Sequence, residues 1–259
     1  MKPAAVQKIA RLMRDASRHR DTYAVFADVC EMMAIALARM DLRQFETREA
    51  RYLELERRHG REFRDMGAAV LAELVNALEV EPFDVLGAVF HELELHNKHV
   101  GQFFAPYELC RMLARMTGGP DEWRAIIAAR GHITVSEPAA GAGAMMIALA
   151  HEMQLAGVNY QKHMHVTAVD VDSRAAHMAF VQLSLLHVPA RVIVGNTLTL
   201  VERECWLTPA HVMGGWSRRL AVAADERAAS ASVASVERIE SRERAAPRIE
   251  VMGDQFALF

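Results

Sequence analysis

The strongest constraint on the fold of this chain is an alternation of strand-like and helix-like patterns after residue 131. The strand-like apolar runs are 132–136, 166–171 and 191–194, and the helix-like segments between them are 144–156 and 173–186. Strands that alternate with helices of this length predict a parallel sheet covered by helices and joined by right-handed crossovers. We therefore expect an α/β protein.

The segments on either side of this pattern differ from it. Residues 1–100 are expected to be helical almost throughout, because apolar residues such as Val25, Val29 and Met32 recur at helical spacing. Pro82 and Asp84 mark a break and the start of a new helix. Residues 221–259 begin with a stretch rich in Ala, Ser, Arg and Glu, which is typical of a solvated tail. We thus expect a helical region over 1–100, an α/β domain over 101–220 and a tail over 221–259.

Composition excludes several classes of protein. Of the 259 residues, 52% are hydrophobic, so a sizeable core can form, and the net charge of -3 is unlike that of a stand-alone nucleic-acid binder. The three cysteines are far apart, which predicts neither a zinc site nor a disulfide framework, and no metal is expected. No signal-like segment starts the chain, and no apolar run approaches the roughly 18–20 residues that span a bilayer. A cytoplasmic protein without membrane contact is expected.

Glycines and polar residues follow the predicted strands where each of them ends. Gly141 and Gly143 lack Cβ atoms, so backbone N–H groups can approach a ligand closely, and the next helix points its N-terminus at the same space. Asp170 ends the second strand, where a carboxylate can accept hydrogen bonds from both hydroxyls of a ribose. Asn196 follows the third strand and could reach an adenine edge. Ligands of open α/β sheets bind at these strand ends, where Glu137 also lies.

A dinucleotide cofactor is the obvious competitor for such a site. The glycine fingerprint of dinucleotide-binding folds requires a third glycine, but Met146 stands at that position. The acidic residue expected about 20 residues further on comes later here, as Asp170. Both departures disfavour NAD.

Four motifs in this part of the chain resemble those of one enzyme family. They are GQFFAP at 101–106, EPAAGAGA at 137–144, AVDVD at 168–172 and GNTL at 195–198. In this order they are similar to motifs of N6-adenine DNA methyltransferases, including the methylation subunit of type I restriction–modification systems. The resemblance implies a Rossmann-like S-adenosylmethionine-dependent methyltransferase fold with a truncated parallel sheet, preceded by an α-helical N-terminal region.

The same resemblance implies roles for individual residues toward S-adenosylmethionine. Phe104 and Pro106 would form a wall at its methionine end, and Glu137 would meet its amino group. Gly141 and Gly143 would line its path, Asp170 would hold the ribose hydroxyls and Asn196, where the family has Asp, would face the adenine. The polar residues that the family carries are replaced by alanine at three positions, Ala105, Ala140 and Ala142, which removes polar contacts to the cofactor.

The catalytic motif of the family, [ND]-P-P-[YF] after the fourth strand, does not occur in this chain. In the family, it accepts hydrogen bonds from the target N6 amine and stacks on the flipped base. At the corresponding distance this chain has Thr208, Pro209, Ala210 and His211. Three interpretations are open: a turn before a helix near Val212, a degenerate motif without activity, or an altered motif that works.

Two functions follow from this resemblance. The first is an S-adenosylmethionine-dependent DNA adenine-N6 methyltransferase with a degenerate catalytic motif. The alternative is a non-catalytic accessory protein of methylase ancestry in restriction–modification or mobile-element biology. DNA is the expected partner, and a specificity or second methylase subunit is a further one. Because the half-sheet that should follow is missing, the fourth strand is expected to be an uncovered edge unless a helix over Met213–Ala224 or another chain hides it.

The last residues of the chain form a separate motif. Gln255, Phe256, Ala257, Leu258 and Phe259 resemble the bacterial sliding-clamp-binding peptide, with Gln255, Leu258 and Phe259 at the characteristic positions. A glutamine with spaced apolar anchors suits a short peptide that docks into a groove. Its place at the end of a tether favours such a role. The other interpretation is a strand or apolar plug on the domain itself.

Overall fold

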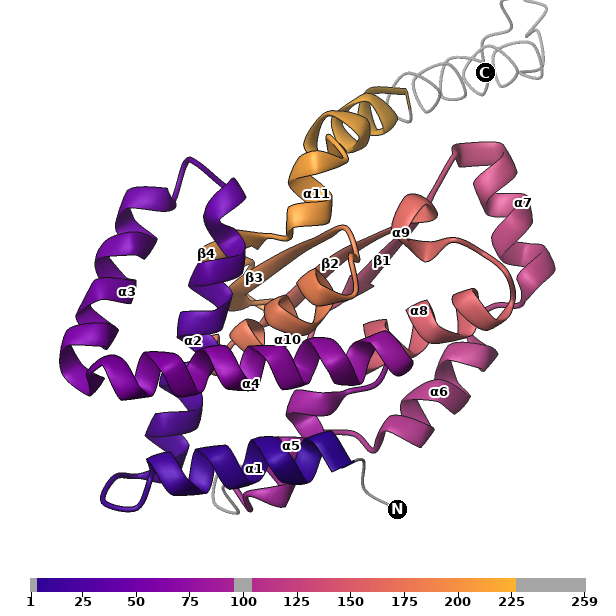
Figure 1. Ribbon diagram of the computed structural model, residues 1–259. Helices are drawn as coiled ribbons and strands as arrows, with labels where there is room; N and C mark the ends of the chain where they lie inside the picture. The colour runs from indigo at the N-terminus through magenta and orange to yellow at the C-terminus, as the bar shows by residue number, and fades with distance from the viewer. Residues whose placement is uncertain (1–3, 96–103, 227–259) are drawn as a thin grey trace, which may run out of the picture. The chain divides into compact units, whose positions relative to one another are not determined.

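The structure is a computed structural model that describes residues 4–95 and 104–226 (Figure 1). Residues Met1–Trp216 form one compact unit, which contains both the helical N-terminal region and the sheet. Residues Ser217–Phe259 form a second unit, whose described part, 217–226, is helical. The helices of the first unit are α1 (Ala4–Ala16), α2 (Thr22–Leu37), η1 (Ala38–Met40), α3 (Phe45–His59), α4 (Arg61–Val80), α5 (Val85–Glu92), α6 (Tyr107–Met116), α7 (Pro120–Arg130), α8 (Ala144–Leu155), α9 (Tyr160–His163), α10 (Ser173–Leu185) and α11 (Pro209–Met213).

The helical N-terminal region forms as its apolar spacing predicts. Helix α1 buries Val6, Ile9, Ala10 and Met13, which share one face, and packs against α4 and α5. Asp84 caps α5 by accepting the Gly87 N–H, which confirms the predicted helix start. Helix α2 packs against α10 of the α/β part. The N-terminal helices therefore share a core with the sheet instead of standing apart from it.

The sheet contains β1 (Ile133–Glu137), β2 (Met164–Asp170), β3 (Ala190–Asn196) and β4 (Val201–Leu207), in the order β1-β2-β3-β4. Strands β1, β2 and β3 are parallel, with α8 and α10 in the crossovers between them. This arrangement confirms the predicted Rossmann-like α/β fold with a helical N-terminal region.

Strand β4 corrects the expectation of a wholly parallel sheet, because it runs antiparallel to β3. The connection between the two strands spans only residues 197–200, and a parallel strand would need a crossover of a dozen residues or more. Leu200 has a positive φ of 57°, which completes this tight turn. The pairing of β3 with β4 shifts register at a bulge between Val194 and Gly195. Glycine fits this position because a Cβ atom at residue 195 would lie 2.5 Å from the Val201 carbonyl oxygen.

The outer strand β4 is covered by a side chain from α3: Arg48 donates to the Cys205 carbonyl at 2.9 Å and lies 4.0 Å over the Trp206 ring. This corrects the expectation that the fourth strand is an uncovered edge.

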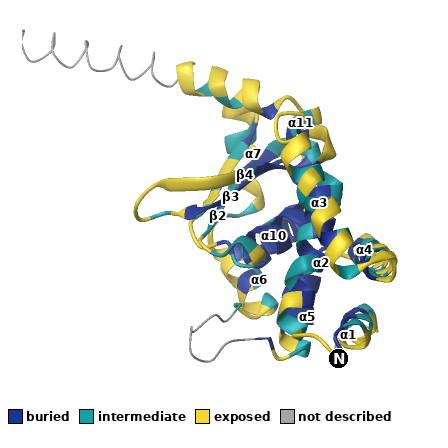
Figure 2. Ribbon diagram, turned by 90° about the vertical axis from the view of Figure 1, so that its left-hand side faces the viewer, coloured by how far each residue is buried: buried dark blue, intermediate teal, exposed yellow. Residues whose placement is uncertain are grey.

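The two faces of the sheet differ in what covers them (Figure 2). Helix α10 packs on one face, against β2 and β3. Buried side chains such as Val166, Ala168 and Val192 alternate along the strands with side chains of the opposite face. On the opposite face, Ser136, Thr167 and Arg191 lie side by side in register and stay at least partly exposed. None of the described helices is long and apolar enough to cross a membrane.

Candidate functional site

Three of the predicted site residues lie at the carboxyl ends of neighbouring parallel strands. Glu137 ends β1, Asp170 ends β2 and Asn196 ends β3. Glu137 pairs with Ala168, and Asp170 pairs with Val194. Strand β2 therefore extends two residues beyond the end of β1, and β3 extends two residues beyond the end of β2. The sheet topology therefore brings the three polar side chains to one edge, as the sequence pattern predicts.

Asp170 organises the backbone around it. Its Oδ2 accepts the Gly141 N–H at 2.8 Å, and its Oδ1 accepts the Asp172 N–H at 2.8 Å. The carboxylate thus joins the loop after β1 to the loop after β2. A carboxylate has about four acceptor positions, so each oxygen keeps capacity for a ligand hydroxyl.

The glycine loop has the conformation that the sequence predicts. Gly141 and Gly143 have positive φ angles of 54° and 97°, a backbone conformation that residues with a Cβ atom rarely adopt. Gly143 is the N-cap of the 12-residue helix α8 and provides no side-chain cap. The first N–H groups of such a helix attract a negatively charged or polar ligand group.

Phe104 lies directly over the glycine loop. A Cβ atom at Gly141 would stand 3.0 Å from the Phe104 ring, so the absence of a side chain at Gly141 favours this close contact. The ring also packs at 5.0 Å from the ring of Phe90. Pro106 is exposed and forms the N-cap of α6. Of the motif at 101–106, residues 101–103 lie outside the described residues.

The end of β3 is fastened to the end of β1. Thr197 donates its hydroxyl proton to the Pro138 carbonyl at 2.7 Å. Asn196 Oδ1 accepts the N–H groups of Leu198 and Thr199, at 2.9 and 3.3 Å. Its amide nitrogen is the donor group that remains, and it suits a ring nitrogen of adenine better than the exocyclic amine. Glu137 Oε1 accepts the Ala139 N–H at 3.1 Å.

A buried residue that the sequence pattern did not indicate holds this loop from behind. Gln182 of α10 donates to the Ala142 carbonyl at 2.9 Å and to Asp84 Oδ1 at 2.8 Å, and its Oε1 accepts the Leu86 N–H at 3.0 Å. Burial raises the pKa of the Asp84 carboxyl. Gln182 is therefore a positioning residue for the glycine loop, and only the three-dimensional contacts reveal it.

The predicted catalytic residues do not lie at this edge. Because β4 runs antiparallel, Leu207 pairs with Arg191 near the start of β3, and Thr208 follows it at the opposite edge of the sheet. Thr208 is completely buried; its hydroxyl accepts the Ala190 N–H at 2.9 Å and donates to the Val188 carbonyl at 2.8 Å. The side chain of Thr208 therefore serves the fold at this position and faces no candidate ligand.

Pro209 and His211 both lie in the short helix α11. Pro209 starts α11, which Thr208 caps by accepting the His211 N–H. The His211 ring is buried, with Nδ1 2.9 Å from Nε2 of His165. The assignment of Thr208, Pro209 and His211 to catalysis therefore does not fit their place in the fold. The segment is also not a turn before a helix near Val212, because α11 already begins at Pro209.

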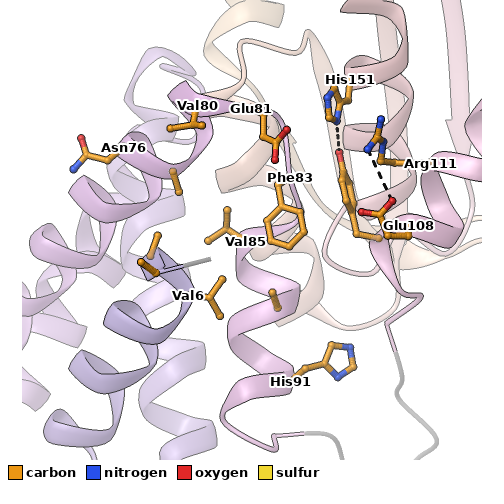
Figure 3. A pocket seen from close by; sticks show the side chains of 15 residues that line it. Val6, Asn76, Val80, Glu81, Phe83, Val85, His91, Glu108, Arg111 and His151 are labelled. Carbon is orange, nitrogen blue, oxygen red and sulfur yellow. Dashed lines mark hydrogen bonds and ion pairs between the residues drawn. The ribbon is translucent and has the colours of Figure 1, made fainter. Parts of the chain in front are cut away.

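A separate pocket of about 750 Å³ lies between the N-terminal helices and α6 (Figure 3). Its apolar wall includes Val6, Val80, Phe83 and Val85, and its polar wall includes Tyr107, Arg111 and His151. The polar side chains of this wall contact one another: the Tyr107 hydroxyl lies 3.2 Å from His151 Nδ1, and Arg111 lies 3.9 Å from Glu108 Oε2. Burial lowers the pKa of His151.

Among the described residues, no group of three or more His, Cys, Asp or Glu side chains could hold a metal ion. At the carboxyl ends of β1 to β3, two carboxylates, one side-chain amide and the backbone of the glycine loop lie close together. The residues at this edge fit a nucleoside with a charged side chain: an acid for hydroxyls, an amide for a base, and a glycine loop at a helix N-terminus.

Comparison with known proteins adds a distant likeness in fold. No protein-family model matches the chain, and no curated protein matches it. Among solved structures, the chain is similar to a Listeria monocytogenes protein provisionally assigned to the class I S-adenosylmethionine-dependent methyltransferases. The identity is 13%, the TM-score is 0.40, and the match covers 72% of this chain and 51% of that one. The chain therefore spans about half the length of that protein, and a likeness this distant does not assign an activity.

Proposed function

We propose that the protein binds S-adenosylmethionine at the carboxyl ends of β1, β2 and β3. The observation that carries this proposal is the convergence of Glu137, Asp170 and Asn196 on one glycine loop, in the order that the resembling methylases use. Asp170 would accept the ribose hydroxyls, and Asn196 would donate to the adenine. The uncapped N-terminus of α8 would face the polar methionine end, next to Phe104.

When bound, S-adenosylmethionine supplies a methyl group on a sulfonium centre that a nucleophile can attack in line. The chain's own residues would orient that centre by fixing the ribose and the glycine loop. We propose DNA as the methyl acceptor, because the four motifs together resemble those of DNA adenine-N6 methyltransferases. The Thr208–His211 segment has no part in this proposal, since its side chains are engaged at the opposite edge.

The position of Thr208–His211, at the edge of the sheet opposite the candidate site, favours a second function. An accessory protein of methylase ancestry would keep the cofactor pocket and need no base-contacting motif of its own. Within 104–226, Thr208 and His211 serve the fold, which favours this accessory role for the chain alone. Methyl transfer would then require a further subunit.

Calorimetric titration of the full chain with S-adenosylmethionine, and with its demethylated product S-adenosylhomocysteine, tests the cofactor proposal. We expect both to bind at one site. The matched variants are Asp170→Asn, which should weaken both, and Asp172→Asn, an equal change in charge two residues away. Absence of binding by the unmodified chain would remove the cofactor proposal.

Transfer of a labelled methyl group to adenine-containing DNA separates the two functions. Transfer by the purified chain alone would support the methyltransferase, and cofactor binding without transfer would support the accessory protein. DNA in which adenine is replaced by N6-methyladenine is the control acceptor, because its amine is already methylated.

A further inference from the structure

The pocket of about 750 Å³ in Figure 3 has no part in the cofactor proposal, because none of its lining residues belongs to the strand ends or to the glycine loop. Small-molecule sites measure roughly 300–1,000 Å³, so this pocket is large enough for an organic ligand. Its walls come from the first turn of α1, the end of α4, α5, the start of α6 and one residue of α8, all within the first compact unit. The chemistry of these walls therefore decides what the pocket can bind.

The inner wall of the pocket is apolar and partly aromatic. Val6 of α1 and Val85 of α5 line it and are buried. The Phe83 ring meets the Tyr107 ring edge-on, with 4.9 Å between the ring centroids. The Tyr107 hydroxyl donates to the Pro82 carbonyl at 2.8 Å, which fixes the orientation of its ring. Such a wall suits the alkyl or aryl body of a ligand, and the two rings also attract a cation that lies within about 6 Å.

Two exposed carboxylates, those of Glu81 and Glu108, lie on the polar side of the pocket. Glu81 follows α4 and has no ion pair with another described residue. Arg111 Nη1 lies 3.9 Å from Glu108 Oε2, which is beyond hydrogen-bond distance (Figure 3). Burial raises the pKa of the Tyr107 hydroxyl, and the charges of Glu81 and Glu108 act in the same direction, so both carboxylates lie near this ring. The pocket therefore combines two acids with two aromatic rings.

The charge of Arg111 is already balanced within the protein. Its Nε donates to Glu152 Oε1 at 2.8 Å, and Arg115 donates to the other oxygen at 2.7 Å. Glu152 is buried, so its carboxylate holds both guanidinium groups close to it. These two arginines together with Glu152 and Glu108 carry no net charge. With histidine counted as neutral, the carboxylate of Glu81 therefore remains as one uncompensated negative charge among the described lining residues.

His151 adds a hydrogen-bond acceptor to the same wall. Its Nδ1 lies 3.2 Å from the Tyr107 hydroxyl, whose proton goes to the Pro82 carbonyl. Nδ1 must then carry the proton of this contact, which leaves Nε2 of the neutral ring as an acceptor. Burial lowers the pKa of His151, so the neutral ring is favoured. An acceptor nitrogen and a carboxylate are both partners for an N–H donor of a ligand.

We propose that this pocket binds a protonated organic amine, with the ammonium group beside Glu81 and Glu108 and the hydrocarbon body against Val6, Val85 and Phe83. The unpaired acid, the apolar wall behind it and the two rings each fit one part of such a ligand. The binding goes beyond the proposed function and does not depend on it, because no lining residue is shared with the strand-end site.

Two other classes of ligand fit the pocket less well. A carboxylate ligand would face Glu81 and Glu108, while the charge of Arg111 is already balanced by Glu152. A neutral alcohol would use the apolar wall but gain no charge attraction from either carboxylate. Helix ends do not reverse this preference, because the positive start of α1 and the negative end of α4 both line the pocket. The starts of α5 and α6 carry acids of their own, Asp84 and Glu108.

Calorimetric titration of the full chain at pH 7.5 with three probes of equal length tests this site. The probes are octylamine, octan-1-ol and octanoate, which carry a cationic, a neutral and an anionic head group. We expect octylamine to bind at one site, at least three-fold more tightly than octan-1-ol and at least ten-fold more tightly than octanoate. Saturation with S-adenosylmethionine should leave the affinity for octylamine unchanged, because the cofactor proposal concerns other residues.

The variant Glu81→Gln should weaken the binding of octylamine at least three-fold and leave the binding of octan-1-ol unchanged. Glu79→Gln is the matched control, since Glu79 is also an exposed acid at the end of α4 but does not line the pocket. Equal weakening by the two variants, equal affinity for the three probes, or displacement of octylamine by S-adenosylmethionine would each overturn the proposal. Absence of octylamine binding would overturn it as well, including absence because residues outside the described ranges fill the pocket. Absence of S-adenosylmethionine binding alone would remove only the cofactor proposal, so the two failures can be distinguished.

Discussion

The Gly141 N–H donates to Asp170 Oδ2 across 2.8 Å and thereby holds the glycine loop after β1 against the end of β2. The second oxygen of the same carboxylate accepts the Asp172 N–H. One side chain thus fixes two loops that would otherwise be free to move apart. Its role in shaping the site and its proposed role toward a ribose are carried by the same two oxygens.

The variant Asp170→Asn should therefore lose both stability and cofactor affinity. An asparagine keeps one acceptor oxygen but turns its amide nitrogen, a donor, toward one of the two backbone N–H groups. At this partly buried position the mismatch should cost about 1 kcal/mol. We expect S-adenosylmethionine to bind at least ten-fold more weakly by calorimetry. Asp172→Asn is the control, and equal affinity of both variants for the cofactor would contradict the role of Asp170.

The variant Gln182→Leu should displace the glycine loop from behind. It removes the bonds that Gln182 makes to the Ala142 carbonyl and the Leu86 N–H and one of the bonds to the Asp84 carboxyl, which keeps the Gly87 N–H; this should cost about 3 kcal/mol in the free energy of unfolding. Urea denaturation measures this loss, and cofactor titration of the folded variant should show weaker binding. Gln7→Leu, at an exposed glutamine on α1, is the matched control and should change neither quantity.

The parts of the fold that the sequence predicts are those set by local patterns. The alternation of apolar runs with helix-length segments predicts β1, α8, β2, α10 and β3 because each element is specified by its own residues. Gly141 and Gly143 are predictable for the same reason, since a turn between strand and helix needs backbone freedom there. Asp170 and Asn196 then follow, because parallel strands end at a common edge.

The parts that escaped prediction depend on residues far apart in the chain. The direction of β4 cannot be predicted from Val201–Leu207, because a strand has the same residue pattern in either direction. The connection at 197–200 decides the direction, since it is too short for a parallel crossover. The contact between Gln182 and Asp84 joins residues 98 positions apart. The exposure of Leu109, Met112, Leu113 and Met116 on α6 also escaped prediction, since their apolar spacing is that of a helix whose face is buried.

The variant Thr208→Val tests whether this threonine is structural. Valine has the same shape but no hydroxyl, so the Ala190 N–H and Val188 carbonyl lose a buried partner. We expect a loss of about 1–3 kcal/mol in the free energy of unfolding. Affinity for S-adenosylmethionine should stay within two-fold of the unmodified chain. A selective loss of cofactor binding without loss of stability would show that Thr208 faces a ligand after all.

The clamp-binding prediction concerns Gln255, Leu258 and Phe259, which lie outside the described residues. If the tail ends in a docking peptide, its apolar anchors should carry most of the affinity for the groove. We expect the double change Leu258→Ala with Phe259→Ala to abolish capture of this protein by a purified bacterial sliding clamp. Met252→Ala, an apolar change in the same tail, should leave capture intact; capture that survives the double change would remove the clamp as a partner.

Acid should destabilise the protein through its buried histidines. Burial lowers the pKa of His151, His177 and His211, so the folded state disfavours the protonated form of these rings. In the unfolded chain a histidine protonates near pH 6.5. As the pH falls below that value, the unfolded chain takes up these protons more readily than the folded chain, so the free energy of unfolding decreases.

His177 should make the largest separable contribution to this acid sensitivity. Neither of its ring nitrogens has a hydrogen-bond partner within the described chain, and the ring packs edge-on against Trp206 at 4.9 Å. His177→Phe removes the buried polar atoms and the proton uptake, so it should raise the urea midpoint at pH 7.5 and reduce its fall at pH 5.5. The raised pKa of Asp84 has the opposite effect on stability in acid, but this effect is the same in His177→Phe and in the unmodified chain. An equal fall in both would mean that His177 does not contribute, because the difference between the two pH dependences isolates this one ring.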